Sequence, residues 1–174
     1  SFFSSLSARI SSRIWSIGRR DCEGEEWTFT INYAANPGGM TTTRLPTVIT
    51  QTEQGKRLLG QLAKRQAVLQ PEHTAYALKR LLGRKHADRE VQTLIGGAPY
   101  PSRAADDGTV VVEIDGESYA IPQLCAHLLT EAKRVAEHHL KQPVTEAVLA
   151  VPVSFDETRC RALETAAKLA GLEV

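Results

Sequence analysis

Cysteine and histidine side chains are the groups in this sequence best suited to hold a metal ion or to act as nucleophiles. The three cysteines, at positions 22, 125 and 160, include no Cys-x-x-Cys pair, and an odd number does not suit a disulfide framework. The five histidines lack paired ligand spacing, because the adjacent His138 and His139 would point in different directions on a helix. We therefore predict no metal site, a reducing compartment, and a small buried apolar role for Cys125.

Two glycines, Gly38 and Gly39, follow Asn36 and Pro37 in a segment typical of a turn, and such glycines can cradle a phosphate. A phosphate-binding loop of the Gly-Lys-Ser/Thr kind also needs a lysine and a hydroxyl residue at fixed spacing. The residues after Gly39 are methionine and threonine, so that spacing is absent. This turn therefore predicts a loop without a nucleotide site.

Charge and hydropathy argue against two classes of partner. The 21 basic and 20 acidic residues give a net charge of +1, which provides no electrostatic case for nucleic acid or an anionic membrane. The longest apolar runs, such as residues 147–153, are much shorter than the roughly 20 residues that cross a bilayer. We therefore expect a globular protein that binds neither nucleic acid nor a membrane.

The first 20 residues differ in composition from the rest of the chain. They contain four arginines and many serines but no acidic residue, and their apolar residues recur at near-helical spacing. This composition is typical of a mitochondrial transit peptide and predicts the mitochondrial matrix as the destination. The alternatives are a disordered or mistranslated extension and a cytoplasmic protein. Residues 21–44 form a divergent segment, in which residues 27–33 alternate as in a strand.

Clearer secondary-structure patterns begin at residue 45. Residues 47–50 predict a short strand, and residues 71–82 predict a helix that begins at Pro71 and ends at Gly83. Residues 110–114 and 117–121 flank an Asp-Gly pair that accepts positive φ, and they predict a β-hairpin.

The C-terminal part of the chain alternates helix and strand patterns. Residues 122–141 follow the 3.6-residue period of a helix, and residues 146–151 predict a buried strand that ends at Pro152. Asp156 predicts the N-cap of a helix that continues to about residue 170, followed by the start of another strand at residues 172–174. This order predicts an α/β fold, and a final strand cut short would indicate a truncated domain.

Four segments, taken in order, resemble one protein family. They read Gly-Gln-Leu-Ala-Lys-Arg-Gln-Ala-Val at 60–68, Leu-Lys-Arg-Leu-Leu-Gly-Arg at 78–84, Gln-Pro-Val-Thr-Glu-Ala-Val at 142–148 before Val-Pro at 151–152, and Ala-Gly-Leu-Glu-Val at 170–174. With these motifs and intervals, residues 45–174 resemble part of the nucleotide-binding domain of heat-shock protein 70 chaperones. The first segment resembles the bacterial and mitochondrial branch of that family.

The resemblance implies a two-lobed, actin-like ATPase domain with a ribonuclease H-like fold. Residues 45–174 would then supply part of the first lobe together with its peripheral subdomain. The resemblance also implies a molecular chaperone that uses ATP and Mg²⁺ to bind and refold unfolded polypeptides. Its expected partners are J-domain co-chaperones and nucleotide exchange factors.

Two residues acquire functional roles through this resemblance. Lys79 matches the family lysine that lies beside the γ-phosphate, where positive charge stabilises phosphoryl transfer, although by itself it reads as a solvated helix lysine. Pro152 matches the proline that relays the nucleotide state to the substrate-binding domain, and it also terminates a strand. Cys160 occupies the position of the relay arginine, and its neighbours Arg159 and Arg161 would point elsewhere on a helix. This departure from the family pattern removes the relay arginine, which weakens the case for allosteric coupling through Pro152.

The family's first phosphate loop, Asp-Leu-Gly-Thr-Thr, is expected near residues 17–20, which read Ile-Gly-Arg-Arg. The second phosphate loop and the adenosine pocket would lie beyond Val174. Because phosphoryl transfer needs several loops together, we predict that the 174-residue chain alone neither binds ATP tightly nor hydrolyses it. Three interpretations stay open: a fragment of an ATP-driven chaperone, a non-catalytic truncated interaction module, and a degenerate gene product.

Overall fold

The computed structural model contains both strands and helices and describes residues 13–18, 26–33, 40–52, 54–149 and 151–174. The strands are β1 Arg13–Gly18, β2 Glu26–Tyr33, β3 Met40–Pro46, β4 Ile49–Gln51, β5 Arg57–Leu59, β6 Thr74–Ala75, β7 Ser102–Ala104, β8 Val110–Ile114, β9 Glu117–Ala120 and β10 Val148–Leu149. The helices are α1 Gln61–Gln66, the 3₁₀ turn η1 Pro71–His73, α2 Leu78–Leu81, α3 Arg89–Gly96, α4 Ile121–Leu140 and α5 Glu157–Leu169.

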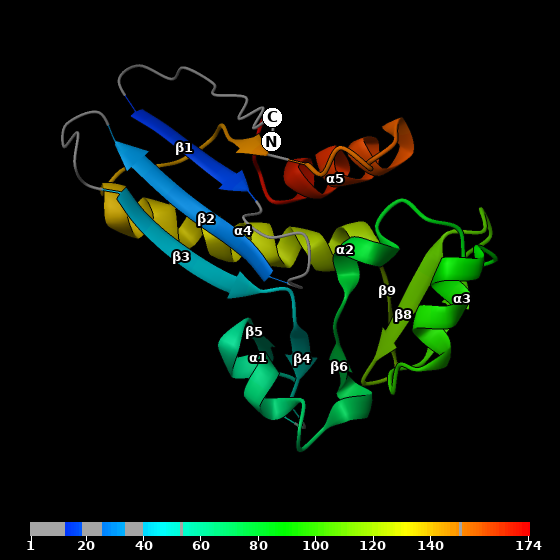
Figure 1. Cartoon of the computed structure of the whole chain (residues 1–174). Helices are drawn as coiled ribbons and strands as arrows, with labels where there is room; N and C mark the ends of the chain where they lie inside the picture. The colour runs from blue at the N-terminus through cyan, green and yellow to red at the C-terminus, as the bar shows by residue number, and fades with distance from the viewer. Residues whose placement is uncertain (1–12, 19–25, 34–39, 53, 150) are drawn as a thin grey trace.

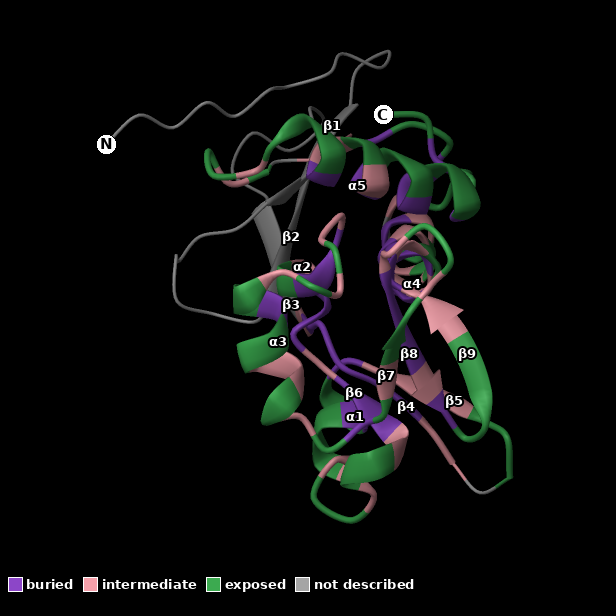
Figure 2. Ribbon diagram, turned by 90° about the vertical axis from the view of Figure 1, so that its right-hand side faces the viewer, coloured by how far each residue is buried: buried purple, intermediate pink, exposed green. Residues whose placement is uncertain are grey.

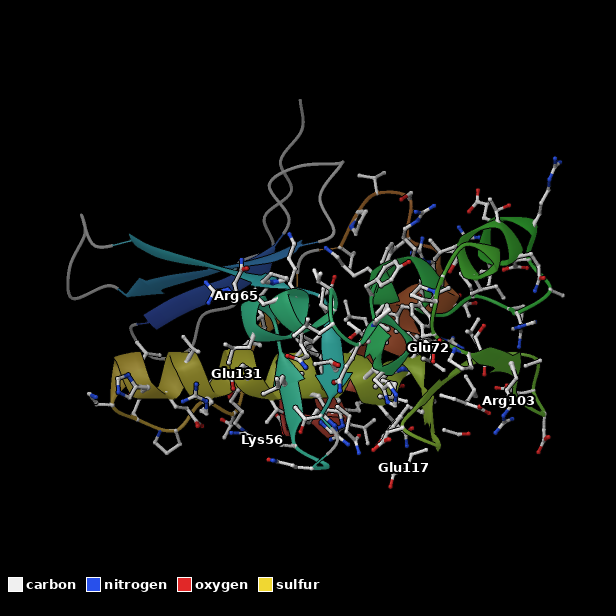
Figure 3. All side chains as sticks on the ribbon, turned by 90° about the horizontal axis from the view of Figure 1, so that it is seen from below. Lys56, Arg65, Glu72, Arg103, Glu117 and Glu131 are labelled. Carbon is white, nitrogen blue, oxygen red and sulfur yellow. The ribbon has the colours of Figure 1, made fainter. Side chains whose placement is uncertain are left out.

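The largest sheet has four strands in the order β10-β1-β2-β3. Strand β1 pairs antiparallel with β2 and parallel with β10, while β2 and β3 are antiparallel. Helix α4 forms a layer along one face of this sheet (Figures 1 and 3). A mixed sheet covered by a helix confirms the predicted α/β class.

Two smaller sheets lie away from the four-stranded sheet, in the order β5-β4-β6 and β7-β8-β9 (Figure 1). All their strand pairs are antiparallel. The predicted hairpin is β8–β9, and its turn has φ of 53° at Asp115 and 78° at Gly116. Positive φ at both turn residues matches the right-handed twist of the strands, which confirms the Asp-Gly signal.

Helix α4 contributes more residues to the hydrophobic core than any other described element, and its buried residues are coloured purple in Figure 2. Its buried positions follow the predicted 3.6-residue period and are Ile121, Leu124, Cys125, Ala126, Leu128, Leu129, Ala132 and Ala136. The same core contains Leu78 of α2, Val112 of β8 and Leu163 of α5. One continuous core therefore links the large sheet's covering helix to the smaller sheets.

The predicted helix over residues 71–82 is wrong. The chain instead forms η1 at Pro71–His73, strand β6 at Thr74–Ala75 and the four-residue helix α2. The Thr74 hydroxyl lies within hydrogen-bond distance of the Gln70 carbonyl, at 2.8 Å, and of the Thr50 hydroxyl, at 2.9 Å, and β6 pairs with β4. Tertiary pairing therefore overrides the local helical pattern.

The strand predicted at residues 146–151 is shorter than expected. Only Val148 and Leu149 form β10, and both are half-buried rather than fully covered. Glu146 makes an isolated parallel bridge with Glu173, so the predicted final strand is reduced to one bridge. Strand β10 pairs with β1 at two positions, Val148 with Ser16 and Leu149 with Ile17.

Part of the predicted N-terminal organisation lies outside the described residues. Strand β1 comes from the segment for which a leader is predicted, while residues 1–12 and 19–25 are not described. The Gly38-Gly39 loop also lies outside the described part. The leader and the loop therefore stay predictions.

The two described cysteines differ in environment. Burial raises the pKa of the Cys125 thiol to about 12, while the charge of Lys79 acts in the opposite direction. Cys160 is half-buried on α5. We therefore expect a short iodoacetamide pulse at pH 8 to label Cys160 and leave Cys125 unmodified, because the thiolate is the nucleophile. Peptide mapping checks this, with the urea-unfolded protein as the control; equal labelling of both in the native state would contradict it.

Candidate functional site

The candidate site is built around Lys79 on the short helix α2. The residue before this helix, Ala77, is buried and has the left-handed φ of 58°, which a non-glycine residue adopts only when its surroundings enforce it. The Tyr100 hydroxyl donates to the Tyr76 carbonyl at 2.8 Å, and the two rings meet edge to face. Tertiary contacts therefore fix where α2 begins.

The end of α2 packs directly against the start of α5. Gly83 has a φ of 68°, and a Cβ at this position would lie 2.7 Å from the Cα of Arg159 and 3.0 Å from its nitrogen. Two backbone segments meet here at a distance that excludes any side chain. The turn after α2 therefore needs glycine both for its conformation and for its packing.

Arg159 connects α5 to α2 through its guanidinium group. Its Nη2 donates to the Lys79 carbonyl at 2.7 Å and its Nε to the Leu82 carbonyl at 3.2 Å. The guanidinium carbon also lies 3.8 Å from the centre of the Phe155 ring. Burial lowers the pKa of Arg159, as does the neighbouring charge of Arg84, yet guanidinium groups stay protonated in proteins. A buried cation thus holds the backbone of Lys79.

The side chain of Lys79 is half-buried. Its positive charge acts on the thiol of the fully buried Cys125, which places the charge near α4. Arg159 of α5 therefore holds Lys79 at its backbone carbonyl, and the charge of Lys79 is close enough to α4 to act on Cys125. The backbone that carries this positive charge is thus held in place, and a positioned cation is what stabilisation of an anionic group requires.

Pro152 lies shortly after β10 and leads into the Arg159 contact. The Phe155 amide donates to the Pro152 carbonyl at 3.0 Å, and the Phe155 ring then packs on the guanidinium group of Arg159. Asp156 caps α5 as predicted, because its carboxylate accepts from the Arg159 amide at 2.9 Å. The structure therefore brings the Pro152 loop and the Lys79 helix together through Arg159. The roles of Lys79 and Pro152 stay predictions.

Arg159 is the site residue that sequence reasoning missed. Arg161 is exposed and pairs with Glu157, so it points away as expected. A signal for Arg159 exists in the helix period, since it shares a buried face with Leu163, Ala166, Ala167 and Ala170. A charged residue on the apolar stripe of a helix indicates a buried partner.

A second polar cluster joins β5, β9 and α4. Arg57 lies 2.8 Å from the Nε2 of His127 and donates to the Tyr119 hydroxyl at 3.0 Å. That hydroxyl also donates to Glu117, which projects from β9 at the edge of the molecule in Figure 3. Burial lowers the pKa of His127, and the Arg57 charge acts in the same direction. The neutral imidazole can accept the hydrogen bond from Arg57, whereas the protonated ring cannot.

This cluster predicts an acid-sensitive contribution to stability. Because the folded-state pKa of His127 lies below its ordinary value of 6.5, the unfolded chain takes up the proton first as the pH falls. The contribution is fully present above about pH 6.5 and declines below it. Urea unfolding at pH 7.5 and 5.5 should show a larger acid loss in the wild type than in His127→Gln. Equal losses would show that His127 makes no such contribution.

The described residues contain neither a membrane-spanning helix nor a cluster suited to bind a metal ion. No helix in this part of the chain combines the length and apolar character needed to cross a membrane. The described ranges also contain no group of three or more histidine, cysteine or acidic side chains arranged for a metal ion. Within the described part of the chain, the Lys79–Arg159 region is the candidate functional site.

Comparison with protein-family models supplies an independent finding. The model described as "Hsp70 protein" matches residues 30–174. The matched range includes β3, α2 with Lys79, the Pro152 loop and α5 with Arg159. It begins within the segment 21–44 that the sequence marks as divergent.

Proposed function

Because the chain belongs to the heat-shock protein 70 family of chaperones, we propose that it contributes to an ATP-driven cycle of binding and refolding unfolded polypeptides. The family's nucleotide-binding domain has the actin-like ATPase fold, and the mixed α/β architecture is consistent with part of that domain. J-domain co-chaperones and nucleotide exchange factors are the partners that this proposal implies.

The fixed position of Lys79 is the observation that carries the proposal. Helix α2 is held at its start by the Tyr76–Tyr100 contact and along its length by Arg159. Bound ATP would supply the phosphoryl group that is transferred, and the ammonium of Lys79 would hold the negative charge of the γ-phosphate. The described residues include no acidic cluster for Mg²⁺, so we assign no residue to the metal.

A refolding assay tests this proposal with the native protein that carries these residues. We expect it to restore activity to a chemically unfolded reporter enzyme in the presence of Mg-ATP, J-domain protein and exchange factor. A non-hydrolysable ATP analogue should not support refolding. Recovery that is equal with ATP, with the analogue and without nucleotide would reject the ATP-driven cycle.

A non-catalytic interaction module is the second candidate, and the residues at 17–20 favour it. They read Ile-Gly-Arg-Arg, without the aspartate and hydroxyl pair of a phosphate loop. Calorimetric titration of the 174-residue chain with Mg-ATP tests whether these residues alone can hold the nucleotide. We expect no tight binding, and micromolar affinity would show that the 174 residues hold the nucleotide by themselves.

We propose the mitochondrial matrix as the site of action, with the cytoplasm as the alternative. The arginine- and serine-rich, acid-free composition of residues 1–20 supports this proposal, as does the bacterial and mitochondrial wording of residues 61–67. Incubation with isolated, energised mitochondria should yield a protease-protected product. A product that stays fully accessible to protease would favour the cytoplasm.

A further inference from the structure

We propose that Arg159 is a positioning residue for Lys79, which it holds by binding the backbone of α2. This inference rests on the proposed function, because the position of Lys79 matters for catalysis only if the lysine acts on ATP. Arg159 touches no reacting group, and its effect is exerted through the carbonyl of Lys79.

Arg159 is buried although it carries a charge. Its exposed fraction is 7%, and the other buried polar residues of the described chain are uncharged threonines. Taking a guanidinium group out of water is costly unless its donors are satisfied. The donors of Arg159 bind two backbone carbonyls and its plane packs on Phe155, so the cost is offset by contacts with α2 and with its own loop.

The two carbonyls that Arg159 binds explain how it fixes α2. The Lys79 carbonyl belongs to α2 and the Leu82 carbonyl to the residue that caps its C-terminal end, so a single planar group binds both the helix and its cap. Arginine suits this role because its donors are arranged in a rigid fork. Close packing at Gly83 keeps the backbone of α5 against the same turn. Arg159 therefore fixes α2 relative to α5 from a defined direction.

Helix α2 is very short. Its four residues are far fewer than an isolated helix needs for stability, so its geometry depends on tertiary contacts. Loss of the Arg159 bonds would release the turn that carries Lys79. Because a misplacement of about 1 Å can lower a rate by about 10²-fold, the consequence for catalysis is large.

Steady-state ATP hydrolysis by Arg159→Gln in the native protein provides the first test. We expect kcat to fall about 10- to 100-fold with little change in KM, because the mispositioned group acts on the transition state. Arg161→Gln, on the same helix but exposed and paired with Glu157, is the matched control and should keep wild-type kcat. Arg159→Lys, which keeps the cation but cannot bridge both carbonyls, should lie between and covers the case in which the glutamine variant does not fold.

Combining Arg159→Gln with Lys79→Ala tests whether Arg159 acts through the lysine. If it does, the double variant should be no slower than Lys79→Ala alone, since residues that act as a unit are not additive. Multiplying losses would overturn the positioning role.

Hydrogen exchange separates failure of this inference from failure of the proposed function. Arg159→Gln should accelerate exchange of the Leu82 amide, which donates to the Leu78 carbonyl, and leave the β8–β9 hairpin unchanged. This readout needs no nucleotide. If the Leu82 amide exchanges faster in Arg159→Gln but the wild-type protein has no ATPase activity, Arg159 does hold α2 and the ATP-driven function is rejected. Unchanged exchange of the Leu82 amide would overturn the inference itself.

Discussion

Replacing Gly83 with alanine is expected to destabilise the protein by about 3 kcal/mol or more. The left-handed φ of 68° is unfavourable for alanine, and the new Cβ would lie 2.7 Å from the Cα of Arg159. It would also lie 3.0 Å from the carbonyl oxygen of Thr158. These are backbone atoms, so relief requires separation of α5 from α2 rather than rotation of a side chain.

Gly116→Ala is the matched control for this change. Gly116 has a similar φ of 78°, but a Cβ there would meet nothing within 4 Å. The control should therefore show only the conformational penalty, about 1–2 kcal/mol. Urea unfolding of both variants measures the difference, and equal losses would show that the close contact between Gly83 and α5 does not determine stability.

Lys79→Ala is expected to lower ATP turnover of the native protein by about 10²- to 10³-fold, because the charge that stabilises the transferred phosphoryl group is removed. Arg80→Ala is the matched control, since Arg80 is an exposed neighbour on the same short helix. Single-turnover hydrolysis should separate chemistry from nucleotide release. Turnover by Lys79→Ala within a factor of two of the control would contradict the catalytic assignment.

The Lys79→Ala experiment also needs a measure of folding. Lys79 is half-buried, and its charge lies near the core residue Cys125, so its removal could change packing. We expect the thermal unfolding midpoint of Lys79→Ala to remain close to that of Arg80→Ala. A large loss of turnover with matched midpoints then assigns the effect to chemistry rather than to stability.

The elements that could be predicted from sequence are those with local causes. Helix α4 carries its own 3.6-residue apolar stripe, and the β8–β9 hairpin carries an Asp-Gly turn that accepts positive φ. The cap at Asp156 is likewise a contact between near neighbours. In each case the stabilising partners lie within the same segment, so no knowledge of the rest of the fold is required.

The helix predicted over residues 71–82 does not form because of contacts with residues that are distant in the sequence. Residues 71–82 carry a plausible helical pattern, yet Thr74 pairs with Thr50 across two strands and Ala77 adopts a left-handed conformation. These contacts join residues that are far apart in sequence, and a periodic pattern cannot reveal them. The helix survives only as α2, the one turn of this segment that faces the core.

The candidate site likewise combines residues that local motifs predict with a contact between residues distant in the sequence. The positions of Lys79 and Pro152 follow from motifs, whereas the link between them depends on the bond from Arg159 to a carbonyl 80 residues earlier. Considering helix directions alone, the sequence predicts that Arg159 points away from the relay position at residue 160. The structure shows that this direction leads into α2, which makes Arg159 part of the Lys79 environment.

Affinity labelling with an acyl-phosphate derivative of ATP tests most directly whether Lys79 lies beside the bound nucleotide. The reagent transfers its acyl group to a lysine beside the terminal phosphate. The native protein is labelled briefly with and without excess Mg-ATP, and modified lysines are identified by peptide mass spectrometry. We predict strong labelling of Lys79 that excess ATP abolishes, with weak and unprotected labelling of the exposed Lys56 and Lys64. Labelling of Lys79 no stronger than that of Lys56, and unaffected by ATP, would contradict a place for Lys79 at the nucleotide.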